Sequence, residues 1–134
     1  MKKGYKALLQ EANAQISACS VDEARKLLDD QGVMFVDLRD PRELDREGMI
    51  PGALHAPRGM LEFWVDPESP YHKPVFASGK RFIFYCASAW RSALATKAMQ
   101  EMGLEPVCHL TGGFTAWRES GGPVVPRPHR EHKS

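Results

Sequence analysis

The sequence has no long apolar run and no recognisable leader. Apolar runs such as FIFY at 82–85 and VMFV at 33–36 fall far short of the roughly 18 residues that a helix needs to cross a bilayer. The first residues, MKKGYKALLQEANAQ, include lysines but no continuous apolar segment behind them and no small-residue cleavage pattern, which argues against a signal peptide. We therefore expect a soluble, cytoplasmic protein with no membrane partner.

Cysteine is scarce, and its spacing excludes the usual structural uses. The three cysteines, Cys19, Cys86 and Cys108, are an odd number without a CxxC pair, so the sequence fits neither a disulfide framework nor a zinc site. At least one thiol must therefore be free within the chain. We expect no metal and no organic cofactor.

An excess of charge of one sign is also lacking. The formal net charge is only +1, which gives no global electrostatic field and does not suggest nucleic acid as a partner. The 134 residues, 43% apolar and 26% charged, have the size and composition of one globular domain. The last residues, RPHREHKS, are basic, and we expect residues 126–134 to be a disordered tail.

Apolar periodicity predicts alternating helices and strands. An apolar stripe predicts an amphipathic helix within an N-terminal extension, residues 1–19; its members are Leu8, Leu9, Ala12 and Ile16. Ser20 and Glu23 form a capping-box pattern that starts a second helix. We further expect strands at 33–38, 53–56, 81–85 and 106–110, and helices after Pro41, near 60–64, up to Gly103 and after Gly112. This alternation indicates a single three-layer α/β domain over residues 20–125, with a parallel β-sheet flanked by helices.

The segment YCASAWRSALA carries the strongest chemical signal. Cys86 stands where a predicted strand ends, and ligands of such folds bind beyond the carboxyl ends of the strands. The helix that follows should begin near Arg91 and Ser92, and its unpaired N–H groups and dipole favour an anion such as a thiolate. The alternative is a buried cysteine packed as a small hydrophobe, which is how we interpret Cys108 and Cys19.

Four ordered blocks of the sequence resemble the single-domain rhodaneses, a family of sulfurtransferases. VDLRDPREL resembles the first strand of that family and the turn after it, and GMIPGALHAP resembles the Gly-His-Ile-Pro-Gly-Ala segment. YCASAWRSA resembles the active-site loop, and LTGGFTAW resembles the Gly-Gly and Trp ending. The resemblance covers residues 20–125 and implies a rhodanese-like fold.

The resemblance also implies a reaction. Cys86 would take a sulfane sulfur from a small anionic donor such as thiosulfate, form a persulfide, and pass the outer sulfur to cyanide or to a thiol. Backbone N–H groups of the loop would hold the persulfide anion. The implied substrate-binding residues are Ala87, Ser88, Ala89, Trp90, Arg91 and Ser92.

Two positions depart from the family pattern. Met49 stands where histidine is common, at a position that we expect to be a packing site. Ala89 stands where many active loops have glycine, and if the loop needs a positive φ there, alanine costs about 1 kcal/mol. Outside the loop, we assign Asp37, Arg39 and Glu43 a structural ion-pair role and place Arg58 at the rim of the pocket.

Two other functions remain open. A phosphatase or arsenate reductase would use a similar Cys-to-Arg loop, but such loops place five residues between the cysteine and the arginine, and here four intervene between Cys86 and Arg91. A non-catalytic binding or regulatory module would use the fold as a scaffold. The sequence does not name the natural sulfur donor or acceptor, or the oligomeric state.

Overall fold

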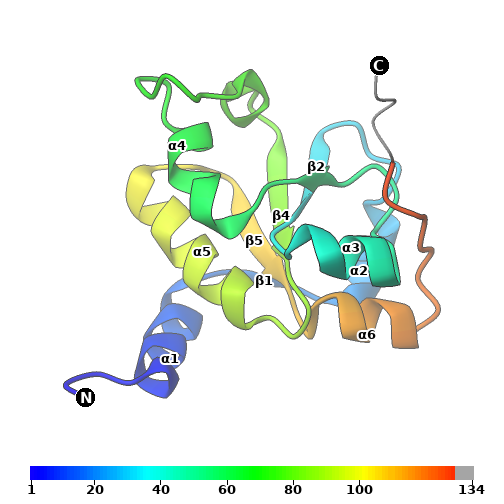
Figure 1. The fold of residues 1–134 in the computed structure, drawn as a ribbon, viewed down its shortest axis with the longest axis horizontal. Helices are drawn as coiled ribbons and strands as arrows, with labels where there is room; N and C mark the ends of the chain where they lie inside the picture. The colour runs from blue at the N-terminus through cyan, green and yellow to red at the C-terminus, as the bar shows by residue number, and fades with distance from the viewer. Residues whose placement is uncertain (129–134) are drawn as a thin grey trace.

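The computed structural model describes residues 1–128 and shows one parallel five-stranded sheet within them, in the order β1-β5-β4-β2-β3 (Figure 1). The strands are β1 (Ala18–Cys19), β2 (Val33–Asp37), β3 (Leu54–His55), β4 (Arg81–Tyr85) and β5 (Val107–Leu110). The α-helices are α1 (Tyr5–Gln15), α2 (Val21–Lys26), α3 (Pro41–Glu47), α4 (Leu61–Val65), α5 (Trp90–Met102) and α6 (Gly113–Glu119), with 3-10 turns η1 (Arg58–Met60) and η2 (Pro74–Ala77). The predicted three-layer α/β fold is confirmed.

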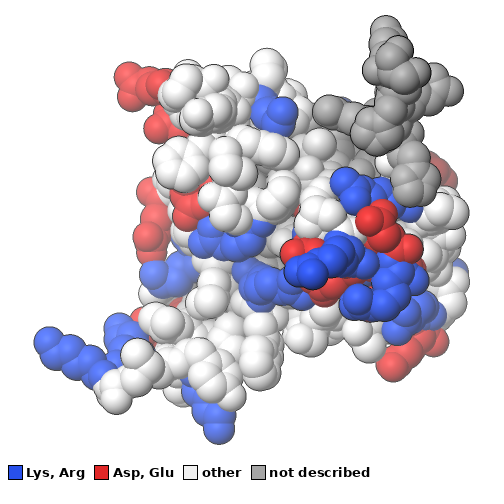
Figure 2. All heavy atoms as spheres, in the orientation of Figure 1, with Lys and Arg blue, Asp and Glu red and all other residues white. Residues whose placement is uncertain are grey.

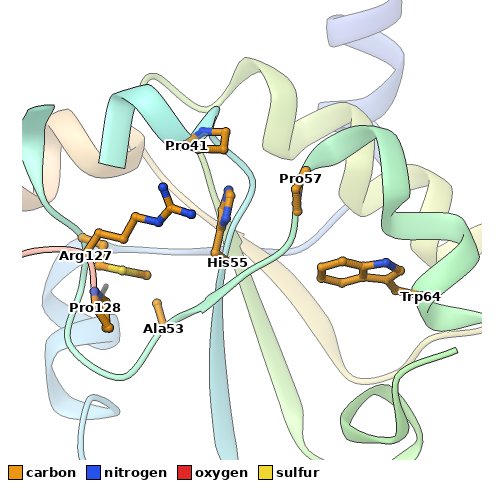
Figure 3. A pocket seen from close by; sticks show the side chains of 8 residues that line it. Pro41, Ala53, His55, Pro57, Trp64, Arg127 and Pro128 are labelled. Carbon is orange, nitrogen blue, oxygen red and sulfur yellow. The ribbon is translucent and has the colours of Figure 1, made fainter. Parts of the chain in front are cut away.

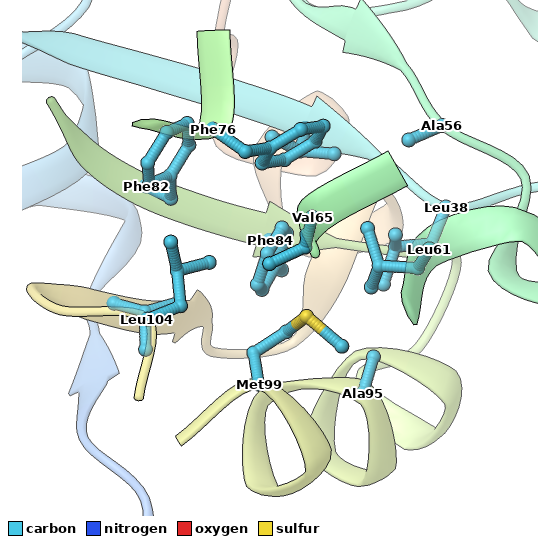
Figure 4. Close-up of a cluster of buried hydrophobic side chains, with 12 residues drawn as sticks. Leu38, Ala56, Leu61, Val65, Phe76, Phe82, Phe84, Ala95, Met99 and Leu104 are labelled. Carbon is cyan, nitrogen blue, oxygen red and sulfur yellow. The ribbon is translucent and has the colours of Figure 1, made fainter. Parts of the chain in front are cut away.

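The central strands explain the layers, because successive side chains point to opposite faces of a sheet. Phe82 and Phe84 of β4 face a core formed with α4 and α5, whose members from these helices are Leu61, Val65, Ala95 and Met99 (Figure 4). Ile83 and Tyr85 face the opposite core, which α2 and α6 cover with Ala24, Phe114 and Trp117. Both faces are therefore buried, as the near-continuous apolar runs predicted.

The caps of two short helices follow from local sequence. Ser20 and Glu23 form the predicted capping box of α2. Asp40 and Glu43 form a second capping box, with Pro41 at the first position of α3. Each box satisfies backbone N–H groups that have no partner inside the helix. Helix α2 ends at Lys26, and the apolar residues after it, Leu27 and Leu28, pack against the core from outside the helix.

The N-terminal region contains the predicted helix, α1, and a strand, β1, that no sequence pattern predicted. Helix α1 forms as expected and packs on α5, but its apolar stripe is only partly covered: Ala12 is buried and Leu8 is 40% exposed. Strand β1 pairs with β5, with Cys19 opposite Leu110. Two residues are too few to show a strand period, so this edge strand escaped sequence analysis.

The predicted location, domain boundaries and disordered tail stay predictions. None of the helices in residues 1–128 has the length and apolar character that a membrane crossing needs, and the cytoplasmic location is not tested by this finding. The predicted domain boundaries at 19/20 and 125/126 are likewise untested. Of the predicted tail, residues 129–134 lie outside the described residues.

Candidate active site

Cys86 lies at the carboxyl end of β4, in the middle of the sheet. The strand pairing continues one step beyond β2, where Leu38 N–H donates to the carbonyl of Tyr85 at 2.9 Å. The thiol follows directly and is 1% exposed. The sheet therefore places the predicted nucleophile at the edge where ligands of parallel α/β folds bind.

The loop after Cys86 turns back on the sulfur through one left-handed residue. Ala89 has φ +74° and ψ +7°, and it is the one non-glycine residue with positive φ in the described chain. Helix α5 starts at Trp90, and the N–H of Ser92 donates to Cys86 Sγ at 3.3 Å. The sequence expectation of a helix start aimed at the sulfur is met, and the position where glycine is common does require the glycine-like conformation.

The loop offers further hydrogen-bond donors. The N–H groups of residues 87–91 donate to no protein acceptor within residues 1–128. Unpaired N–H groups at a helix start carry partial positive charge and favour an anion. The loop can therefore act as an anion receptor beside the thiol.

The first turn of helix α6 is hydrogen-bonded to the backbone of this loop. The N–H of Phe114 donates to the carbonyl of Cys86 at 2.8 Å, and the N–H of Thr115 donates to the carbonyl of Ala87 at 3.1 Å. In a trans peptide the C=O and the N–H of the same unit point in opposite directions, so the N–H groups of Ala87 and Ser88 are directed away from α6. The start of α6 is thus part of the site, because it holds the backbone of the loop.

Ser92 and His109 extend the site into the interior. Both are buried, Ser92 Oγ lies 3.7 Å from Cys86 Sγ, and Ser92 Oγ lies 3.0 Å from His109 Nδ1. Burial lowers the pKa of His109, which favours the neutral ring. Sequence analysis missed His109, because it stands 23 positions after Cys86. Only the packing of β5 against α5 brings the His109 ring within hydrogen-bond distance of Ser92.

Arg91 is held by Glu43. The guanidinium donates from Nη1 and Nη2 to the two carboxylate oxygens at 2.7 and 3.0 Å. These hydrogen bonds hold the pKa of Glu43 at about 2. Glu43 therefore forms an ion pair, as predicted, and its partner is Arg91, the one charged residue of the loop. Basic side chains form a band across the face shown in Figure 2, mixed with acidic ones near α3.

The remaining predicted residues lie near the surface. Ser88 is exposed, and Trp90 is 55% exposed with its ring centroid 5.2 Å from that of Tyr5 in α1. Arg58 pairs with Glu62 at 2.7 Å. A cavity of about 580 Å³ opens beside α3, β3 and α4, and none of the loop residues lines it (Figure 3); its walls are Pro41, Met49, Ala53, His55, Pro57, Trp64, Arg127 and Pro128.

The comparison with known protein families decides to which family this fold belongs. The family model for the rhodanese-like domain matches residues 20–120. The chain belongs to the rhodanese-like domain family. A sulfurtransferase from Allochromatium vinosum is 33% identical over 102 residues, which make up 76% of this chain and 87% of that relative. The predicted family and fold are confirmed.

Two solved structures resemble this rhodanese-like domain over most of its length. A protein of unknown function from Rhodopseudomonas palustris, described as a possible tyrosine phosphatase, is 52% identical with a TM-score of 0.90, over 93% of this chain and 96% of that chain. A polysulfide-sulfur transferase homodimer from Wolinella succinogenes is 30% identical with a TM-score of 0.69, over 97% of this chain and 93% of that chain.

Replacing Ala89 by glycine is expected to stabilise this rhodanese-like domain by about 0.5 to 1 kcal/mol. The left-handed conformation strains an L-residue by about 1 to 2 kcal/mol, and the greater freedom of glycine in the unfolded chain offsets about 0.5 to 1 kcal/mol. Urea unfolding measures the change. Ala87→Gly is the matched control: Ala87 has no positive φ, so this variant should be destabilised, and equal effects of the two changes would contradict the strain argument.

Proposed function

We propose that this protein is a sulfurtransferase that carries a sulfane sulfur as a persulfide on Cys86. The observation that carries the proposal is the buried thiol at the end of β4, with the Ser92 N–H on its sulfur and with amides at residues 87–91 that have no acceptor among the described residues. The name of the Allochromatium relative, a sulfurtransferase, supports the same class of reaction.

The sulfur would pass in two steps. The Cys86 thiolate attacks the sulfane sulfur of thiosulfate, an S–S bond forms to Cys86, the S–S bond of the donor breaks, and sulfite leaves with its electron pair. A cyanide or thiolate acceptor then attacks the outer sulfur and releases the Cys86 thiolate. The loop residues Ala87, Ser88, Ala89, Trp90, Arg91 and Ser92 would bind the substrate, with their amides around the persulfide anion. No redox cofactor or metal takes part in either step.

The donor is proposed as a small anion. The unpaired amides favour a negatively charged donor such as thiosulfate, while the pairing of Arg91 with Glu43 leaves the mouth of the loop with little net charge. A polysulfide is a second candidate donor, because the Wolinella relative is a polysulfide-sulfur transferase. A cytoplasmic location, with its reducing thiols, would suit a thiol acceptor.

Intact-protein mass spectrometry after incubation with thiosulfate tests the proposal. We expect a gain of one sulfur atom that cyanide removes, and no gain in a folded Cys86→Ser variant. Cys108→Ala is the matched control and should gain sulfur as the wild type does. Cys108 is the other thiol that could compete for sulfur, because its Sγ lies 4.0 Å from Arg81 Nη2 and the hydrogen bond from Cys19 lowers its pKa to about 7. Sulfur gain by Cys86→Ser, or no gain by wild type with thiosulfate or polysulfide, would contradict the assignment.

A phosphatase is the second candidate, because the Rhodopseudomonas relative is described as a possible one. The same loop argues against it for this chain. Four residues separate Cys86 from Arg91, one fewer than phosphate loops require, and both guanidinium nitrogens that would clamp a phosphate are bound to Glu43. Hydrolysis of p-nitrophenyl phosphate that requires Cys86 would reverse this ranking. Neither sulfur gain nor hydrolysis would favour a non-catalytic binding module.

A further inference from the structure

Cys86, Ser92 and His109 form a continuous chain of polar atoms inside the protein. The sulfur lies 3.7 Å from Ser92 Oγ, with the thiol as donor, and Oγ lies 3.0 Å from His109 Nδ1. The backbone N–H of Ser92 also donates to the sulfur. All three side chains are buried: Cys86 is 1%, Ser92 0% and His109 5% exposed. The thiol therefore has a hydrogen-bonded path to an imidazole that does not pass through solvent.

The surroundings of His109 favour the neutral imidazole. Its neighbours across the sheet are Phe84 on β4 and Ala18 on β1, neither of which titrates. From α5, Ser92 faces the ring with an uncharged hydroxyl. Burial disfavours the imidazolium in these surroundings, and in the Nε2–H tautomer of the neutral ring Nδ1 accepts from Ser92 Oγ–H. The hydroxyl oxygen then accepts from the thiol.

We propose that His109 is a positioning residue that receives the proton of Cys86 through the hydroxyl of Ser92. This inference rests on the proposed function, since it concerns the ionisation that precedes attack on a sulfur donor. The S–H bond breaks as an O–H bond forms, and the original O–H bond breaks as an N–H bond forms at Nδ1. The products are a thiolate, an intact hydroxyl and an imidazolium, with no electron gained or lost.

We call the path from Cys86 through Ser92 to His109 the relay. Its hydrogen bonds reverse their direction when the proton moves along it. In the product state Nδ1–H donates to Ser92 Oγ, and the hydroxyl donates to the Cys86 thiolate, next to the existing donor of the Ser92 backbone. The thiol–imidazole and thiolate–imidazolium states contain the same number of protons. Their ratio is therefore independent of pH, as in coupled pairs that titrate as one unit. A thiol that loses its proton to solvent has no such behaviour.

The rate of Cys86 alkylation by iodoacetamide, measured against pH by peptide mass spectrometry, tests the relay. Peptide analysis separates Cys86 from Cys19 and Cys108. In the wild type we expect the rate to flatten into a shoulder below neutral pH, where the relay supplies thiolate. In His109→Gln, the amide side chain can accept a hydrogen bond but not a proton. The alkylation rate of this variant should therefore fall about tenfold for each unit by which the pH is lowered. Near pH 6.5 it should be about tenfold below the rate of the wild type.

Two further variants separate the relay from a structural effect. Ser92→Ala keeps the backbone donor to the sulfur but removes the hydroxyl, so it should lose the shoulder as His109→Gln does. Thr96→Val is the matched control, because Thr96 is buried one turn further along α5 and its hydroxyl has no protein partner among residues 1–128; it should keep the wild-type profile.

The result that overturns the relay is a shoulder in folded His109→Gln or Ser92→Ala, or no shoulder in wild type. Should His109→Gln not fold, Ser92→Ala against Thr96→Val decides alone. Alkylation needs no sulfur donor, so the profile tests the relay separately from the persulfide measurement. A protein with the shoulder but no sulfur gain would keep the relay and lose the proposed function; sulfur gain without the shoulder would do the reverse.

Discussion

Replacing Asp37 by asparagine is expected to lower the free energy of unfolding by about 3 to 5 kcal/mol, the usual cost of leaving a buried charge without its partner. Asp37 and Arg39 are both 0% exposed. Arg39 Nε and Nη2 donate to the two oxygens of Asp37 at 3.0 and 2.8 Å, and the N–H of Arg39 donates to one of them at 3.0 Å. Asparagine keeps the shape and removes the charge.

The ion pair also reaches the candidate site. The guanidinium of Arg39 lies 4.1 Å from the centre of the Phe114 ring, and the backbone of Phe114 holds the carbonyl of Cys86. Loss of the pair should therefore loosen α6 and, through it, the loop. The predicted structural role of Asp37 and Arg39 agrees with these contacts.

Urea unfolding measures the effect, with Arg42→Ala as the control. Arg42 pairs with Asp40 at 3.3 Å, but its side chain is 88% exposed, and exposed pairs contribute only about 0 to 1 kcal/mol. Equal losses in Asp37→Asn and Arg42→Ala would show that burial does not set the energy of the pair. Such a result would contradict the prediction.

Replacing Gly113 by alanine is expected to cost about 1.5 to 4 kcal/mol and to reduce sulfur loading of Cys86. Gly113 has φ +64°, which strains an L-residue by about 1 to 2 kcal/mol, and the smaller freedom of alanine in the unfolded chain offsets about 0.5 to 1 kcal/mol of this strain. A Cβ atom would also lie 2.6 Å from the carbonyl oxygen of Ala87 and 2.7 Å from that of Cys86. Such overpacking adds about 1 to 3 kcal/mol. Because both neighbours are backbone atoms of the active loop, relief of the clash must move the loop.

Gly79→Ala is the matched control. Gly79 has φ +80°, but a Cβ atom there would meet nothing within 4 Å, so this variant isolates the strain of the left-handed conformation. Urea unfolding and the mass-spectrometric sulfur gain should be measured on both variants. The prediction holds if Gly113→Ala loses more stability than Gly79→Ala and alone loads sulfur slowly; full loading by Gly113→Ala would show that α6 does not position the loop.

Local patterns in the sequence determined most of the fold. Strands β2 and β4 were predictable because apolar runs of β-branched and aromatic residues mark strands buried on both faces. Helix starts were predictable where capping is local, as in the capping box of Ser20 and Glu23. Strand β1 was not, because two residues have no period and the pairing partner lies about 90 positions away.

The loop shows the same division. Its order of residues determined the cysteine at a strand end, the helix start behind it, and the position where alanine stands in a left-handed conformation. All three depend on neighbours in sequence. The residues that contact the loop from other elements depend on the sheet instead. The strand order places β5 beside β4, and α5 packs against both strands.

Only the tertiary structure decided which distant side chains meet at the site. Glu43 reaches Arg91 across 48 positions, His109 reaches Ser92 across 17, and the N–H of Phe114 reaches the carbonyl of Cys86. Hydrogen bonds act over about 3 Å, whereas local sequence patterns describe residues within one or two turns of each other. The sequence therefore determined the candidate nucleophile and its loop, and the packed sheet decided which distant side chains and backbone groups contact them.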